Sequence, residues 1–101
     1  MINLTSEQLA EVRKILAEHV PDLEVRVFGS RVDGSSKQNS DLDLVIISPT
    51  KLDWRVIERI RDSFSSSNLP FLVDVLDHNS LEKGVAEMVE DCSEVIQEPT
   101  V

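Results

Sequence analysis

Two aspartates stand at the start of a strongly apolar segment, residues 41–47, which reads DLDLVII. A segment of this length and composition predicts a buried β-strand, and Ser48-Pro49 would end it. Side chains alternate between the two faces of a strand, so Asp41 and Asp43 project from the same face. Two adjacent carboxylates repel each other unless a cation lies between them. The segment therefore predicts a sheet that carries a charged site on one face of a central strand.

Two further segments have the pattern of strands. Residues 23–28 alternate apolar and polar side chains and run into Gly29. Residues 71–76 form another apolar run, which is interrupted by Asp74. Aspartate is unfavourable in such a strand, so a role for Asp74 is expected. If the strands at 41–47 and 71–76 are neighbours in the right register, Asp74 lies beside the first two aspartates.

The intervening segments predict helices. Thr5 and Gln8 have capping-box spacing, and Pro21 would end the helix that follows. Residues 30–40 predict a short helical turn and a loop. Asp53 is a plausible cap for the next helix, and Asn79 or Ser80 for the last one. The apolar residues at helical spacing are Leu9, Val12, Leu16 and Val20 in the first helix, Trp54, Ile57, Ile60 and Phe64 in the next, and Leu81, Val85, Met88 and Val89 in the last.

The resulting order is α-β-α-β-α-β-α, and residues 94–97 either extend the last helix or add a short edge strand. We favour the strand. The fold class is α+β (α/β), with a small mixed sheet flanked by helices. At 101 residues, we expect residues 1–101 to form a single domain.

Composition narrows the range of partners. The net charge is −9, with 19 acidic and 10 basic residues, which disfavours direct nucleic-acid binding but suits a basic protein partner. The four aromatic residues include no tyrosine, so stacking on unpaired bases is also disfavoured. We expect a cytoplasmic protein, because one cysteine cannot form an internal disulfide and neither a signal peptide nor a membrane span is evident.

The three aspartates have the chemistry of a metal site for phosphoryl transfer. Clustered carboxylates suit Mg²⁺, and three of them suit two metal ions about 3.5–4 Å apart. Asp74 is then the candidate to meet the attacking hydroxyl, as general base or as metal ligand. The turn at Gly29-Ser30 could cradle phosphate, and Arg31, with Lys37 as a further candidate, could add positive charge.

Structural explanations remain open for each of these residues. Asp41 and Asp43 could be turn and edge-strand residues, and Gly29-Ser30 could be an ordinary strand-to-helix connection. Asp74 could cap a helix or pair with Arg26 or Arg31. We expect His19 and His78 to be solvated. The helix that begins at Trp54 presents an apolar stripe, which would face either the core or a partner.

Taken together, residues 29–34 (GSRVDG) and 40–44 (SDLDL) resemble the signature of polymerase-β-like nucleotidyltransferases, in particular the minimal nucleotidyltransferases (MNT). The third aspartate of the family corresponds to Asp74. The resemblance implies that the Gly29-Ser30 pair holds phosphate, and that Asp41, Asp43 and Asp74 hold Mg²⁺. It also implies transfer of AMP from ATP to a hydroxyl. Minimal members resemble antitoxins that are paired with HEPN-domain toxins, which they can adenylylate.

The resulting expectation is an enzyme: a Mg²⁺-dependent adenylyltransferase that acts on a HEPN partner as its antitoxin, within a hetero-oligomer. One alternative is a stoichiometric antitoxin in which the nucleotide chemistry is vestigial. A further alternative is transfer to a small-molecule hydroxyl.

Overall fold

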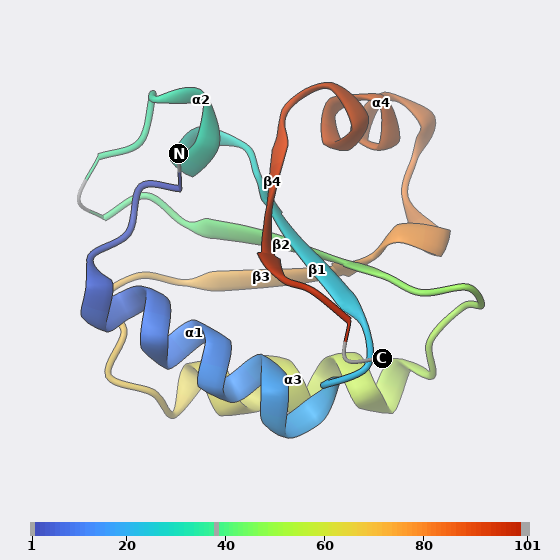
Figure 1. Ribbon diagram of the computed structural model, residues 1–101, viewed down its shortest axis with the longest axis horizontal. Helices are drawn as coiled ribbons and strands as arrows, with labels where there is room; N and C mark the ends of the chain where they lie inside the picture. The colour runs from blue at the N-terminus through green and yellow to red at the C-terminus, as the bar shows by residue number, and fades with distance from the viewer. Residues whose placement is uncertain (1, 38, 100–101) are drawn as a thin grey trace.

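The computed structural model describes residues 2–37 and 39–99. Figure 1 shows a sheet with helices packed on it. The elements are α1 (Ser6–His19), β1 (Glu24–Phe28), α2 (Ser30–Asp33), β2 (Leu42–Ile47), α3 (Trp54–Ser65), β3 (Val73–Asp77), the 3₁₀ helix η1 (His78–Ser80), α4 (Lys83–Asp91) and β4 (Ser93–Gln97).

The four strands form one mixed sheet in the order β3-β2-β1-β4. The strand β1 pairs antiparallel with both β2 and β4, whereas β2 and β3 are parallel. The predicted mixed sheet is confirmed, and so is the strand that we favoured near the C-terminus. Because β2 and β3 are direct neighbours, the condition for bringing Asp74 beside the other two aspartates is met.

The two faces of the sheet are covered by different helices. Helices α1 and α3 pack side by side on one face, and α4 packs on the other (Figure 1). The main core lies under α1 and α3, and its buried members are Val12, Ile15, Leu16, Val20, Val25, Val27, Leu42, Leu44, Ile46, Ile60, Phe64, Val75 and Ile96. A smaller core of Phe28, Val45 and Val89 lies under α4. On β2, Leu42, Leu44 and Ile46 face the main core, and Asp43 alternates with them along the strand. Asp43 therefore lies on the face that α4 covers, as Val45 does.

Two of the predicted helix caps are confirmed. The Thr5 side chain accepts a hydrogen bond from Gln8 N, and the Gln8 side chain accepts one from Thr5 N, which completes the capping box of α1. The Asp53 side chain accepts from Arg55 N at the start of α3.

The predicted start of the last helix is wrong. Asp77 is the final residue of β3, and its carboxylate accepts hydrogen bonds from Asn79 N at 3.0 Å and Leu52 N at 2.8 Å. This buried carboxylate holds residues 78–80 in the tight turn of η1, so neither Asn79 nor Ser80 caps α4. The helix α4 begins instead at Lys83. Leu81 precedes the helix but still packs against the smaller core.

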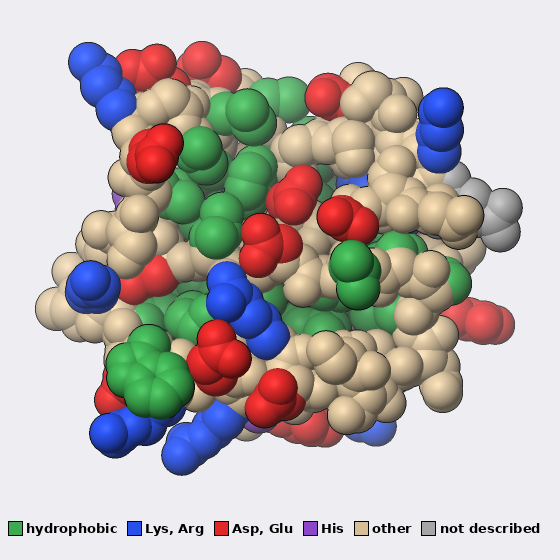
Figure 2. All heavy atoms as spheres, turned by 180° about the vertical axis from the view of Figure 1, so that it is seen from behind, with side chains coloured by type: hydrophobic (Ala, Val, Ile, Leu, Met, Phe, Trp, Pro, Cys, Tyr) green, Lys and Arg blue, Asp and Glu red, His purple; other side chains and the backbone are tan. Residues whose placement is uncertain are grey.

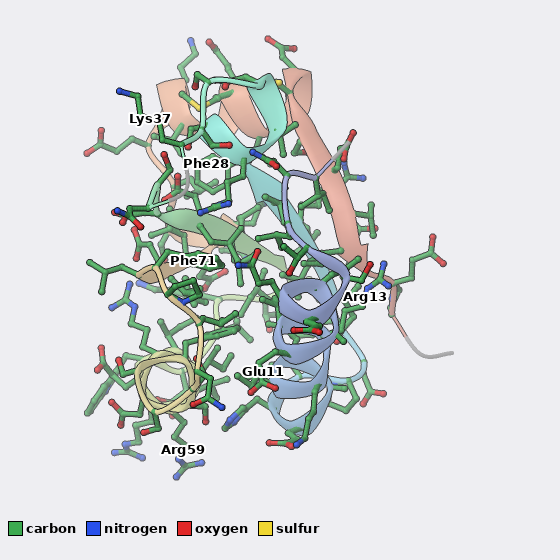
Figure 3. The ribbon with its side chains drawn as sticks, turned by 90° about the vertical axis from the view of Figure 1, so that its left-hand side faces the viewer. Glu11, Arg13, Phe28, Lys37, Arg59 and Phe71 are labelled. Carbon is green, nitrogen blue, oxygen red and sulfur yellow. The ribbon has the colours of Figure 1, made fainter. Side chains whose placement is uncertain are left out.

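Side chains of α1 and β4 connect the two ends of the chain. Arg13 Nε donates to Ile96 O at 3.0 Å, and Figure 3 shows Arg13 beside the end of the β4 ribbon. Gln97 Nε2 donates to Val20 O and Leu23 O, both at 2.8 Å. These contacts hold β4 on the edge of the sheet. Within the described ranges, no helix is long and apolar enough to cross a membrane.

Candidate active site

The turn between β1 and α2 brings backbone directly against an aspartate of β2. Phe28, the last residue of β1, pairs with Asp43, and Gly29 follows it. Gly29 has φ 80° and ψ −150°, a region that only glycine adopts readily. A Cβ atom at this position would lie 2.8 Å from Asp43 Oδ2. Glycine is therefore required twice, by the backbone conformation and by the close approach of the carboxylate.

Asp43 also faces the third aspartate. The parallel register of β2 and β3 pairs Asp43 with Asp74, as the site hypothesis required. The pKa of the half-buried Asp43 carboxyl is raised, first by burial and then by the negative charges of Asp74 and Asp41. In Figure 2, acidic side chains gather near the middle of the face seen from behind. The geometry thus brings three carboxylates close enough for their charges to interact.

Asp74 has a cationic partner that we did not predict. Its Oδ1 lies 3.4 Å from Arg61 Nη2, on α3. The same nitrogen donates to Val75 O at 2.8 Å. The structural alternative that we left open, a pair with Arg26 or Arg31, is therefore not observed, and Arg26 instead forms a salt bridge with Glu24 at 2.7 Å. In the sequence, Arg61 is a charged residue within the otherwise apolar stripe of its helix, and this position was the available signal for a buried or paired role. The sequence does not show which strand that stripe covers, so the partner of Arg61 could not be predicted.

Arg31 is directed into the protein, in contrast to the phosphate ligand that we expected. The residue is only 4% exposed. Its guanidinium donates to Ser40 O at 2.7 and 3.1 Å and to Asn3 O at 2.8 Å, and it lies over the Phe71 ring. Burial lowers its pKa, and the charge of Asp41 partly offsets this effect. The arginine therefore anchors the loop that leads into Asp41.

The fit of this site to Mg²⁺ rests on its donor set. Carboxylate oxygens are the preferred ligands of a hard divalent cation. The pKa of Asp43 is raised first by burial and then by the negative charges of Asp74 and Asp41, and a bound cation would offset both effects. The carboxylates do not form a ready-made cage: in residues 2–37 and 39–99, no group of three His, Cys, Asp or Glu side chains is positioned to hold a metal ion. Asp74 is instead turned toward Arg61. The residues fit a metal ion provided that this side chain reorients.

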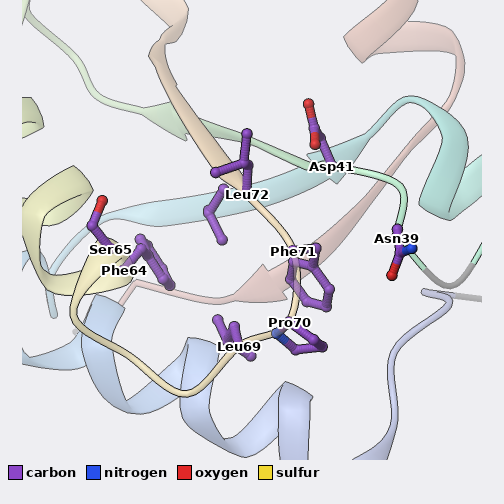
Figure 4. A pocket seen from close by; sticks show the side chains of 9 residues that line it. Asn39, Asp41, Phe64, Ser65, Leu69, Pro70, Phe71 and Leu72 are labelled. Carbon is purple, nitrogen blue, oxygen red and sulfur yellow. The ribbon is translucent and has the colours of Figure 1, made fainter.

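A pocket of about 530 Å³ borders the site at Asp41. Its lining combines apolar and polar groups. Asp41 lies just before β2, outside the strand in which we predicted it, and Figure 4 shows Phe64, Leu69, Pro70 and Phe71 below it, with the Asp41 side chain pointing away from them. Asn39 and Ser65 add polar groups. Asp41 therefore lies at the rim of a space that a ligand could enter, whereas Asp43 and Asp74 do not line this pocket.

The remaining candidates have other roles. His19 is hydrogen-bonded to Ser63 Oγ at 2.7 Å, so it connects α1 to α3 rather than being simply solvated. Trp54 is 68% exposed, which excludes it from the core and leaves the partner-facing alternative. Lys37 is exposed in the loop after α2 and points outward in Figure 3.

A glycine-bearing strand–turn–helix packed against paired aspartates, with a third aspartate on the adjacent parallel strand, defines a nucleotidyltransferase-type site. Residues 9–96 match the nucleotidyltransferase domain family. The chain is also 44% identical, over 96% of its length and 85% of the relative's, to a probable protein adenylyltransferase MntA of Haemophilus influenzae. The chain belongs to the nucleotidyltransferase domain family, which confirms the enzyme class expected from the sequence.

Several solved structures of related architecture are toxin–antitoxin complexes. One such structure contains AMP-PNP and matches with a TM-score of 0.75 at 22% identity, over 91% of this chain and 74% of the other. Another is a tri-AMPylated Shewanella oneidensis HEPN toxin in complex with its MNT antitoxin, with a TM-score of 0.59 at 20% identity, over 89% and 69%. At these identities the matches establish a shared fold.

Proposed function

We propose that this protein is a single-domain, Mg²⁺-dependent adenylyltransferase that transfers AMP from ATP to a hydroxyl of a HEPN-family toxin, and so acts as its antitoxin. The observation that carries the proposal is the contact of the Gly29 backbone with Asp43, in register with Asp74. The H. influenzae relative is named a protein adenylyltransferase, which supports a protein as acceptor. The AMPylated toxin in one structural relative supports a HEPN partner.

Each residue of the site has a role in this reaction. The Gly29-Ser30 turn would hold the nucleotide phosphates, and Asp41, Asp43 and Asp74 would hold Mg²⁺. Bound Mg²⁺ would offset phosphate charge and lower the pKa of the acceptor hydroxyl. The hydroxyl oxygen attacks the α-phosphorus of ATP, its proton passes to Asp74 or to water, and pyrophosphate leaves. Arg31 contributes indirectly, because it fixes the loop before Asp41.

The acidic character of the chain favours a protein acceptor over a nucleic acid. The net charge of −9 would repel a polyphosphate backbone but attract a basic protein surface. Exposed Trp54 offers an apolar contact for such a partner. Binding the partner would also supply the acceptor specificity for which a chain of this size has little room.

The test is labelling of the purified toxin partner with ATP and Mg²⁺. We expect AMP to appear on the partner with the wild-type protein, and Asp41→Asn or Asp43→Asn to abolish labelling. Asp62→Asn is a matched control, because it removes the same charge from an exposed position on α3. Labelling that persists in the Asp41 or Asp43 variant would exclude this mechanism. Neutralisation of the toxin by an Asp41/Asp43 double variant would favour the stoichiometric alternative.

A further inference from the structure

The site contains a cation of its own. Arg61 extends from α3 to β3, where Nη2 contacts both Val75 O at 2.8 Å and Asp74 Oδ1 at 3.4 Å. The shorter contact is an ordinary hydrogen bond, whereas the longer one lies beyond the usual range for N–H···O. Nη1 lies 3.3 Å from Glu58 Oε1 one turn earlier on the helix. The Val75 carbonyl is therefore the main anchor of the guanidinium, and its contacts with both carboxylates, Asp74 included, are longer and easier to break.

Asp74 has the freedom to leave this contact. Its side chain is 53% exposed, on a strand at the edge of the sheet. Asp43 lies directly across from it on β2. Neighbouring strands are about 4.8 Å apart, so a change of side-chain rotamer redirects a carboxylate from one side of its strand toward the other. In the state described here, Asp74 is turned to Arg61 and the three carboxylates do not converge.

We propose that Arg61 is a positioning residue for Asp74. The Arg61 guanidinium acts as an internal counter-ion that holds the Asp74 carboxylate, and a metal ion must displace the guanidinium before it can bind this carboxylate. This inference rests on the proposed function only in assigning Asp74 to the metal site. Arg61 pairs with Glu58 and Asp74 and not with Asp41 or Asp43, so these two carboxylates are available before Asp74, which joins last. Arg61 thereby keeps the site incomplete until a metal ion, alone or carried by a nucleotide, is bound firmly enough to recruit the third carboxylate.

The test measures Mg²⁺ binding alone, without nucleotide or partner. Backbone amide shifts are followed during a MgCl₂ titration at constant ionic strength, for wild type, Arg61→Gln and Arg59→Gln. Arg59 is the matched control because it lies on the same helix, is exposed and points away from the sheet in Figure 3. An exposed ion pair is a weak competitor, so Arg61→Gln should bind Mg²⁺ about twofold to fivefold more tightly than wild type. Equal affinities for the two glutamine variants would overturn the proposal.

A second comparison separates positioning from a general charge effect. In an Asp74→Asn background, Arg61→Gln should no longer change Mg²⁺ affinity, because the carboxylate for which Arg61 competes is absent. A gain that persists in this background would contradict the proposal. Arg61→Lys keeps the charge and should bind Mg²⁺ within about twofold of wild type, since a lysine can still pair with Asp74.

A third measurement remains possible even if the Arg61→Gln variant does not fold. The Arg61 guanidinium resonance, assigned by its loss in Arg61→Lys, should shift when Mg²⁺ is added to wild-type protein and stay in place in Asp74→Asn. An unchanged resonance in wild type at saturating Mg²⁺ would overturn the proposal. These readouts are distinct from labelling, so failure of adenylylation and failure of the Arg61 inference are separately visible.

Discussion

At the scale of single residues, Gly29 allows the backbone to lie close to the Asp43 carboxylate. An alanine there would combine an unfavourable φ of +80° with a Cβ 2.8 Å from Asp43 Oδ2. We expect Gly29→Ala to lower the free energy of unfolding by about 1–3 kcal/mol and to abolish AMP transfer, because Asp43 must move. Urea unfolding and partner labelling measure the two effects.

Gly34 provides the control for Gly29. It has a similar φ of +88°, but nothing lies within 4 Å of a Cβ built there. Gly34→Ala should therefore lose about 1–2 kcal/mol of stability from backbone strain yet retain labelling below its melting temperature. Loss of activity in both variants at equal stability would show that strain, and not the contact with Asp43, is decisive.

Asp43 should reduce stability in the absence of metal. Its folded pKa is raised, so the folded state binds more protons than the unfolded state between the unfolded pKa, about 4, and the folded pKa. Stability therefore falls as pH rises through this window and stays lower above it. We expect Asp43→Asn to raise the free energy of unfolding at pH 7 in EDTA.

The comparison for Asp43 is Asp62→Asn at the same pH, which reduces the net charge equally at an exposed position. Only Asp43→Asn should stabilise the protein clearly, and it should also weaken the stabilisation of the fold by added Mg²⁺. A destabilised Asp43→Asn protein in EDTA would mean that the carboxylate is needed for folding rather than for binding.

At the scale of elements, Arg31 joins three separate segments. It connects α2 to the N-terminal segment at Asn3 and to the loop before β2 at Ser40. A lysine carries the charge but cannot reproduce this forked pattern of hydrogen bonds. We expect Arg31→Lys to lower the free energy of unfolding by about 2–4 kcal/mol, measured by urea denaturation.

The same variant distinguishes an anchor from a phosphate ligand. If Arg31 only positions the loop, the KM for ATP in Arg31→Lys should change little at temperatures where the protein is folded. A normal stability with a strongly raised KM would restore Arg31 as a phosphate contact.

The strands were predictable because their patterns are local. Alternation in residues 23–28 and the apolar runs around Asp43 and Asp74 identify strands without reference to the rest of the chain. The start of α4 was missed because it depends on Asp77, which accepts a hydrogen bond from Leu52, 25 residues away. Arg61 was missed for the same reason: its partner lies on another element.

At the scale of the whole molecule, the sheet order determines whether a site can exist. Asp41 and Asp43 are close in sequence, but Asp74 is placed in register with Asp43 only because β3 lies next to β2 in parallel. The apolar pattern favoured a covered sheet but could not choose among strand orders. The sequence therefore identifies which residues could form the site, and the structure supplies the strand order that places them together.

The account is tested most directly by the intact mass of the toxin partner after co-expression with this protein. With the wild-type protein we predict that the partner gains the mass of one or more AMP groups, and that co-expression with Asp41→Asn or Asp43→Asn leaves its mass unchanged. A partner that is neutralised in the cell yet carries no added mass with the wild-type protein would contradict adenylylation as the function.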